Sequence, residues 1–180
     1  VTYMFLHYDF LHILFNMLWL FWFGRIFLEY LEPKRLLSVY LIGGFSGAAL
    51  YIASFNLLPA FDSVVAVSLA LGASASVYAI VVAISAYVPD YSIGLFFIGR
   101  IKLKYIAIFV VVLDILSIAK GNAGGHIAHL GGALFGYLFA IRLKKGRDII
   151  KGFSAIMDYL FIFFKFGSKM KVSSGKFKTS

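Results

Sequence analysis

The chain contains no cysteine, so neither disulfide bonds nor thiolate metal ligands can contribute to its structure. Charged residues are also scarce: they make up 14% of the chain, against about a quarter in ordinary soluble domains. Hydrophobic residues account for 62% of the 180 positions. This composition argues against a water-soluble globular domain and predicts a protein whose outer surface faces lipid.

Negative charge is the scarcer sign, with 8 Asp and Glu residues against 17 Lys and Arg residues and a formal net charge of +9. Such an excess can indicate a nucleic-acid-binding protein, but here the basic residues form short clusters between apolar segments. That pattern is typical of loops that face the cytoplasm and anionic lipid. We therefore expect the lipid bilayer, and no nucleic acid, as a partner.

Five apolar segments approach the roughly 20 residues that cross a bilayer. They cover about residues 5–23, 36–55, 72–88, 105–118 and 125–143. Residues 61–71 are a weaker apolar stretch, and residues 91–104 are expected to be an interfacial connection. The predicted fold is an all-α, polytopic membrane helical bundle.

The basic clusters follow the first, third and fifth segments, so the positive-inside rule predicts that these three run from outside to inside. The protein is then a multi-pass integral membrane protein, expected in a bacterial inner membrane, with a cytoplasmic C-terminus. Because Val1 lies almost inside an apolar run and no basic n-region precedes it, no signal peptide is expected. A preceding helix of opposite direction would make the five transmembrane helices six. We expect a transmembrane domain over residues 1–145 and a basic cytoplasmic tail over 146–180, with an amphipathic stretch at about 148–166 and disorder over 169–180.

A run of small residues, Leu71 to Tyr78, begins the third segment and contains Ser74. Such a serine is either a packing residue or a nucleophile. Because the first, third and fifth segments share one direction, His12, Ser74 and His129 should lie at comparable depths. Gly132 and Gly136 share a helix face with His129 and would let another helix approach closely.

These groups suit acyl transfer. His129 could take the proton of the Ser74 hydroxyl and later return it to the leaving amine. His12, Asn16 and the backbone N–H of Ser74 could donate hydrogen bonds to the oxyanion. No acidic residue is expected near the outer ends of these segments, because Asp114 is placed deep in the fourth segment and is interpreted as a structural group. We therefore predict a Ser–His dyad whose histidine is oriented by packing, with Tyr78 as the candidate neighbour.

Three motifs in order, His12-x-x-x-Asn16, Gly72-x-Ser74 and Ala128-His129-x-x-Gly132-x-x-x-Gly136, resemble those of the rhomboid family of intramembrane serine proteases. The resemblance covers about residues 6–143. It implies a helical bundle with a water-filled cavity that opens outward, and it implies that Ser74 is the nucleophile and His129 the base.

The resemblance also implies that His12 and Asn16 help to bind the oxyanion, that Tyr78 packs on the histidine, and that His7 is linked to water supply. Its implied substrates are transmembrane proteins cut in or beside a membrane helix, often after a small residue. No cofactor is expected. The family's first helix and the loop after it are absent from this sequence, and Ala75 stands where the family usually has glycine.

Other interpretations remain open at this point. A catalytically inactive rhomboid-like protein would bind transmembrane segments without cutting them, although retention of both Ser74 and His129 favours the protease. A small transporter would place polar residues through both halves of the membrane, whereas here they gather in the outer half. Ser76 is a second hydroxyl, but it would point about 200° away from Ser74 on a helix. His126 lies three residues before His129, yet no carboxylate is expected beside the pair, so no metal site is predicted.

Overall fold

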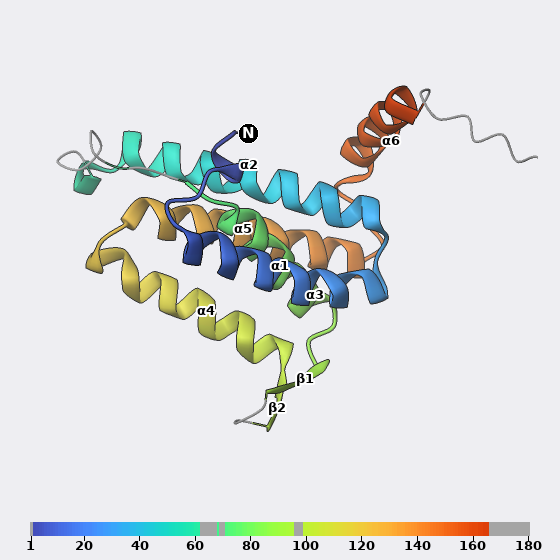
Figure 1. Ribbon diagram of the computed structural model, residues 1–180, viewed down its shortest axis with the longest axis horizontal. Helices are drawn as coiled ribbons and strands as arrows, with labels where there is room; N and C mark the ends of the chain where they lie inside the picture. Colours follow the sequence, from blue (N-terminus) through green and yellow to red (C-terminus); the bar gives the residue numbers. More distant parts are fainter. Residues whose placement is uncertain (1, 62–67, 69–70, 96–98, 166–180) are drawn as a thin grey trace, which may run out of the picture.

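Figure 1 shows the computed structural model of the chain, which describes residues 2–61, 68, 71–95 and 99–165. Six α-helices dominate it: α1 (Phe10–Tyr30), α2 (Pro33–Leu57), α3 (Ser74–Tyr87), α4 (Leu103–Ser117), α5 (Ala123–Lys144) and α6 (Lys151–Lys165). The 3-10 helices are η1 (Thr2–Phe5), η2 (Pro59–Phe61) and η4 (Ile118–Lys120). Strands β1 (Ser92–Leu95) and β2 (Gly99–Lys102) form an antiparallel hairpin. The predicted all-α membrane-type bundle is confirmed.

The first helix begins later than predicted. The segment starting at about residue 5 is divided into η1 and α1, because the Asp9 side chain accepts a hydrogen bond from the His12 backbone N–H at 2.8 Å and caps α1. At the other end, α1 continues to Tyr30, beyond the predicted end at about residue 23.

The predicted connection between α3 and α4 contains the β1–β2 hairpin, which the sequence analysis did not foresee. The weaker stretch at 61–71 is described only at residues 61, 68 and 71. The predicted disordered tail, 169–180, lies outside the described residues.

Among the described residues, α1, α2 and α5 are long and apolar enough to cross a membrane. The other predicted spans are shorter: α3 has 14 residues and α4 has 15. Many large apolar side chains of α1 and α4 are exposed, for example Phe15, Trp22, Ile108 and Phe109. A continuous apolar exterior of this kind is expected of a surface in contact with lipid.

Helix α3 is the centre of the bundle and packs against α1, α2, α4 and α5. Its side chains from Ala79 to Ile84 are almost fully buried. It packs against the glycine face of α5 that the sequence predicts, at Gly132 and Gly136. A Cβ added at Gly132 or Gly136 would collide with the carbonyl oxygen of Ala75 or Ala79. The backbones of α3 and α5 are therefore in direct contact, as small residues permit in membrane bundles.

Contacts at both ends show that α1, α3 and α5 run in the same direction. Near their starts, Ser74 of α3 contacts His129 of α5. Near their ends, the Lys144 ammonium donates to the Ala86 carbonyl oxygen at 3.3 Å, and the Tyr30 and Tyr91 rings pack edge to face. In Figure 1 the connected helices α2 and α4 run the opposite way. Residues at the starts of α1, α3 and α5 therefore lie at one end of the bundle.

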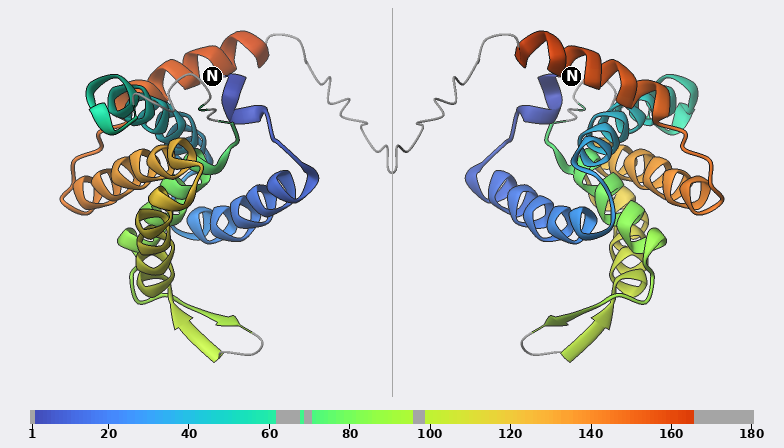
Figure 2. Two further views of the ribbon diagram at one scale, coloured as in Figure 1. Left: turned by 90° about the vertical axis from the view of Figure 1, so that its left-hand side faces the viewer. Right: turned by 90° about the vertical axis from the view of Figure 1, so that its right-hand side faces the viewer.

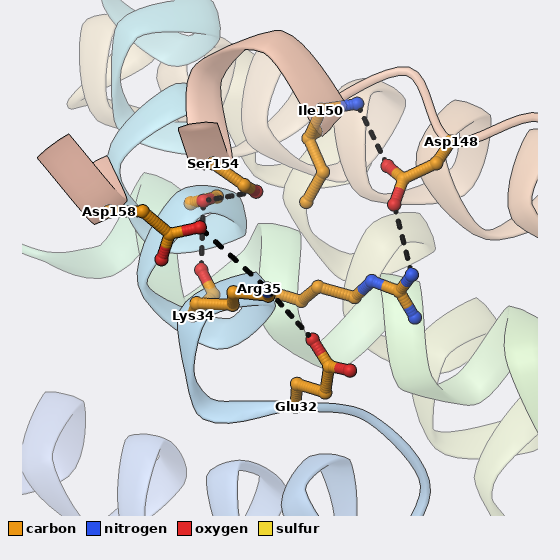
Figure 3. A network of polar contacts seen from close by, with 8 residues as sticks. Glu32, Lys34, Arg35, Asp148, Ile150, Ser154 and Asp158 are labelled. Carbon is orange, nitrogen blue, oxygen red and sulfur yellow. Dashed lines mark hydrogen bonds and ion pairs between the residues drawn. The ribbon is translucent and has the colours of Figure 1, made fainter. Parts of the chain in front are cut away.

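Helix α6 is attached at the opposite end of the bundle, beside the start of α2. Figure 3 shows the contacts: Arg35 pairs with Asp148 at 3.0 Å, and the hydroxyls of Ser38 and Ser154 lie 3.1 Å apart. The side views in Figure 2 place α6 and the β1–β2 hairpin on opposite sides of the bundle. The predicted amphipathic stretch thus forms a helix anchored to α2.

Candidate active site

Ser74 is the first residue of α3, and the backbone just before it, at Gly72, passes close to α1. Gly72 has φ +118°, and its N–H donates to the Tyr3 carbonyl oxygen at 3.0 Å. Only glycine adopts this backbone conformation easily. A Cβ at Gly72 would also lie 2.7 Å from Nε2 of His12. The glycine therefore lets the start of α3 pass directly under the His12 ring.

The Ser74 hydroxyl and the His129 imidazole are in contact. Ser74 Oγ lies 2.6 Å from His129 Nε2, although 55 residues separate them in the sequence. The distance is that of a strong hydrogen bond. The aromatic face of Tyr78 stacks on the His129 ring, with centroids 4.5 Å apart and planes 14° apart. Since Tyr78 follows Ser74 by one helical turn, α3 supplies both the hydroxyl and the platform under the imidazole.

The other side of the His129 ring meets a carboxylate, which the sequence analysis did not expect. Asp114 Oδ1 of α4 lies 3.1 Å from His129 Nδ1 and 2.5 Å from His126 Nδ1. The Asp114 residue is 4% exposed. The expectation that no acidic residue lies near the histidine is therefore wrong, and packing alone does not orient the ring.

The depth of Asp114 could have been found from the sequence. It lies three residues before the end of α4, which runs antiparallel to α5, so it falls at the same end of the bundle as His126 and His129. The earlier interpretation placed Asp114 deep in the span. It did not count from the helix end that adjoins α5.

The same three residues form a set that could hold a metal ion. One ligand atom each from Asp114, His126 and His129 lies within 4.8 Å of the others. Carboxylate and imidazole are ligands that zinc accepts. The stated reason for expecting no metal, the lack of a carboxylate, is therefore wrong. In this structure both imidazoles are already within hydrogen-bonding distance of Asp114 Oδ1.

His12 and Asn16 lie on the α1 face that is turned toward Ser74. The Asn16 amide Nδ2 donates to the His12 carbonyl oxygen at 2.8 Å, which leaves its second hydrogen free of that bond. Asn16 is buried, at 6% exposure. Together with Ser74 and His129 these two side chains line a cavity of about 330 Å³, completed by Phe15, Trp19, Val77, Tyr78 and Val110.

His7 lies next to the site but contacts it through the backbone. Its Nε2 accepts a hydrogen bond of 3.4 Å from the Ala73 N–H, and its ring packs edge to face on His12. A larger cavity of about 820 Å³ also reaches His12 and is bounded by the ends of the helices, including Asp9 of α1 and Asn122 before α5. His12 lines both cavities, which lie at the same end of the bundle.

Ala75 and Ser76 both point away from this cavity. A Cβ at Gly47 of α2 would lie 2.6 Å from the Ala75 methyl group, so that methyl packs toward α2. Ser76 is fully buried, and its hydroxyl lies beside Gly44 of α2. The helical geometry therefore gives Ser74, and not Ser76, the contact with His129.

Comparisons with known proteins agree with the motifs. A family model described as the Rhomboid domain matches residues 1–146. The chain is similar to RHOMBOID-like protein 12, mitochondrial, of Arabidopsis thaliana, with 31% identity over 156 residues. That match covers 82% of this chain and 46% of the plant protein, so the chain spans less than half of that relative's length. No solved structure matches.

Proposed function

Because the chain belongs to the rhomboid family, we propose that it is an intramembrane serine endopeptidase in which Ser74 is the nucleophile and His129 the general base. The observation that carries the proposal is the 2.6 Å contact between Ser74 Oγ and His129 Nε2 beside a cavity. A serine hydroxyl becomes an effective nucleophile when a base lies within hydrogen-bond reach.

In the acylation step the Ser74 Oγ attacks the peptide carbonyl carbon while its proton moves to His129 Nε2. The donors that we propose for the developing oxyanion are the Asn16 amide, the His12 ring and the backbone N–H of Ser74, which belong to residues lining the same cavity. The Ser74 N–H is free of the helix ladder because it belongs to the first residue of α3. His129 then protonates the leaving amine. In the second step a water molecule gives a proton to His129 Nε2 and attacks the acyl carbon, the bond from that carbon to Ser74 Oγ breaks, and His129 returns the proton to Ser74 Oγ as the acid leaves.

The proposed substrates are transmembrane segments of membrane proteins. The cavity lies between α1, α3, α4 and α5, and α1 and α4 carry exposed apolar side chains. An apolar helix that lies against these surfaces would keep its side chains in lipid or protein while one peptide bond enters the cavity. The polar lining is suited to a carbonyl group in that position.

The chain is a membrane protein by its apolar helices and its family. We further propose the orientation given by the basic clusters, with the site end toward the outside and α6 in the cytoplasm. The name of the plant relative places that protein in mitochondria, and we do not extend this location to the present chain.

The test compares Ser74→Ala with Ser76→Ala in the full-length protein, using cleavage of a single-span substrate in membranes. Removal of a serine nucleophile costs at least about 10⁴-fold in rate, so Ser74→Ala should abolish cleavage. Ser76→Ala, which loses a hydroxyl of the same helix facing α2, should retain it. Equal cleavage by wild type and Ser74→Ala would overturn the proposal. Binding of the segment without cleavage by wild type would favour an inactive rhomboid-like protein.

A further inference from the structure

We infer that Asp114 is a positioning residue for His129, so that the site works through a Ser74–His129–Asp114 arrangement instead of a serine and a histidine alone. This inference rests on the proposed function. Asp114 belongs to α4, which supplies neither the nucleophile nor the base, and its Oδ1 lies 3.1 Å from His129 Nδ1. Asp114 acts through the histidine and does not touch the substrate.

The position of the hydrogen on the His129 imidazole decides which nitrogen can act as the base. A neutral histidine carries one N–H and one acceptor nitrogen, whereas an ionised carboxylate only accepts. The contact with Asp114 Oδ1 therefore requires the hydrogen on His129 Nδ1. Nε2 is then the acceptor, and it is this atom that lies 2.6 Å from Ser74 Oγ. The carboxylate selects the one tautomer that can remove the serine proton.

His126 explains how the carboxylate itself is held. Its Nδ1 lies 2.5 Å from the same Oδ1, and its ring is nearly perpendicular to that of His129, at 89°. Two donors on one turn of α5 thus fix an oxygen that comes from α4. A carboxylate with a side chain only 5% exposed needs such donors, because burial of an unpaired charge is costly.

The reacting step is balanced by groups already present. As the Ser74 Oγ–carbon bond forms, the hydroxyl proton passes to Nε2, and His129 becomes an imidazolium with hydrogens on both nitrogens. Asp114 remains ionised and accepts from Nδ1 throughout. The carboxylate therefore stabilises the charge that appears on His129 in addition to fixing its tautomer.

Asparagine at position 114 separates positioning from a structural role. An asparagine oxygen in the place of Oδ1 can still accept from both imidazoles, so the hydrogen bonds and the His129 tautomer are kept. It carries no negative charge, so the imidazolium that forms on His129 during the reaction loses its stabilisation. A structural role predicts that Asp114→Asn, which keeps the hydrogen bonds, reacts like wild type. Positioning predicts that Asp114→Asn reacts more slowly and that Asp114→Ala, which also frees the ring, is slower still.

The experiment measures labelling of the full-length protein by a fluorophosphonate probe, in which the Ser74 Oγ–phosphorus bond forms, the phosphorus–fluorine bond breaks and fluoride leaves. Thermal unfolding midpoints are recorded for the same variants. We expect Asp114→Asn to be labelled at least about 10-fold more slowly than wild type, with a midpoint close to that of wild type, and Asp114→Ala to be labelled more slowly again, by about 10²- to 10⁴-fold. Asp90→Asn, which removes an exposed carboxylate at the other end of the bundle, should be labelled at the wild-type rate.

Each failure has its own signature. Ser74-dependent labelling of Asp114→Asn at the wild-type rate would overturn the positioning role and leave the protease proposal standing. No labelling of wild type would overturn both. If a chelator abolished labelling of wild type and zinc restored it, Asp114 would be a metal ligand and the inference would be wrong; we expect labelling to survive chelation.

A second readout does not need activity. Nitrogen-15 shifts of the imidazole, assigned with His126→Gln and His129→Gln, report which nitrogen carries the hydrogen. We expect hydrogen on Nδ1 of His129 in wild type and in Asp114→Asn, and on Nε2 in Asp114→Ala, which lacks the acceptor. Hydrogen on Nδ1 in Asp114→Ala as well would contradict the inference.

Discussion

Two clusters of polar contacts lie at opposite ends of the bundle, and they are built from different chemistry. The site cluster, Ser74, Asp114, His126 and His129, joins α3, α4 and α5. The anchor cluster, Arg35, Ser38, Asp148 and Ser154, joins α2 to the segment around the start of α6 (Figure 3). Both contain a carboxylate with a nitrogen donor, and both contain a serine with a hydrogen bond.

The difference lies in what the serine contacts. Ser38 meets another hydroxyl and its own helix backbone at the Lys34 carbonyl oxygen, so its contacts only hold helices together. Ser74 meets an imidazole nitrogen beside a cavity. A buried serine therefore says little by itself; the pairing with a titratable acceptor and an open space is what makes it a candidate nucleophile.

The largest expected effect comes from Gly132→Leu, which should force apart α3 and α5, the helices that carry Ser74 and His129. The new side chain would meet the Ala75 backbone of α3, and the seam between α3 and α5 cannot widen without moving the helices. We expect a loss of about 3 kcal/mol in the free energy of unfolding. Gly24→Ala on α1 is the control, since its Cβ would have only an ordinary contact at 3.9 Å. Thermal unfolding in detergent measures both; equal midpoints would contradict the close seam.

The next effect sharpens the assignment of the site cluster. Asn16→Ala should slow cleavage by about 10²- to 10³-fold, because an oxyanion donor is lost. Asn56→Ala of α2 is a matched control, since its amide makes the same bond to the carbonyl four residues earlier, Ile52, at 2.7 Å. Cleavage rates of wild type and the two variants show whether Asn16 acts as an oxyanion donor. Similar rates for the two variants would assign Asn16 to helix structure alone.

Arg35→Met tests the anchor cluster and should have a smaller effect on a different quantity. Its pair with Asp148 is partly exposed, with side-chain exposures of 27% and 21%, so we expect a loss of about 1 kcal/mol in stability. Cleavage should stay within about twofold of wild type. A double-mutant cycle with Asp148→Asn isolates the pair. A coupling near zero would show that the pair does not stabilise the anchor cluster. A large loss of cleavage would show that this cluster also affects the site.

The smallest effect is expected at Asp90, which lies with Lys102 and Lys104 near the hairpin. Hydrogen bonds from Lys104 and then Lys102, each at 2.9 Å, lower the pKa of Asp90 from 3.8 to about 2. A lowered pKa means that the contribution to stability is present above pH 3.8 and is lost as the pH falls toward 2. Because the carboxyl group is exposed, salt screens the pair.

Asp90→Asn should therefore lower the unfolding midpoint only slightly at pH 6, and by a still smaller amount near pH 2. Unfolding scans at both values, with and without added salt, measure the difference. A midpoint difference that grows toward pH 2 would reverse the sign argued for this carboxylate.

Much of the fold follows from the sequence because long apolar segments predict the helices of a membrane bundle. The predicted spans at 36–55, 105–118 and 125–143 agree with α2, α4 and α5 within a few residues. The boundary of α1 did not follow, since an aspartate cap at Asp9 outweighed a continuous apolar pattern. The hairpin did not follow either, because its strands are only 4 residues each and are interrupted by glycines.

The sequence by itself determined that the chain is an all-α membrane protein of the rhomboid type, and that Ser74 and His129 belong to helices of one direction. Helix direction and residue position fix depth along the bundle. They do not fix which helices are neighbours around its axis. Only the tertiary structure decided that α4 brings Asp114 to the His129 ring and that Ala75 packs against α2, because lateral neighbours are set by how small residues let backbones approach.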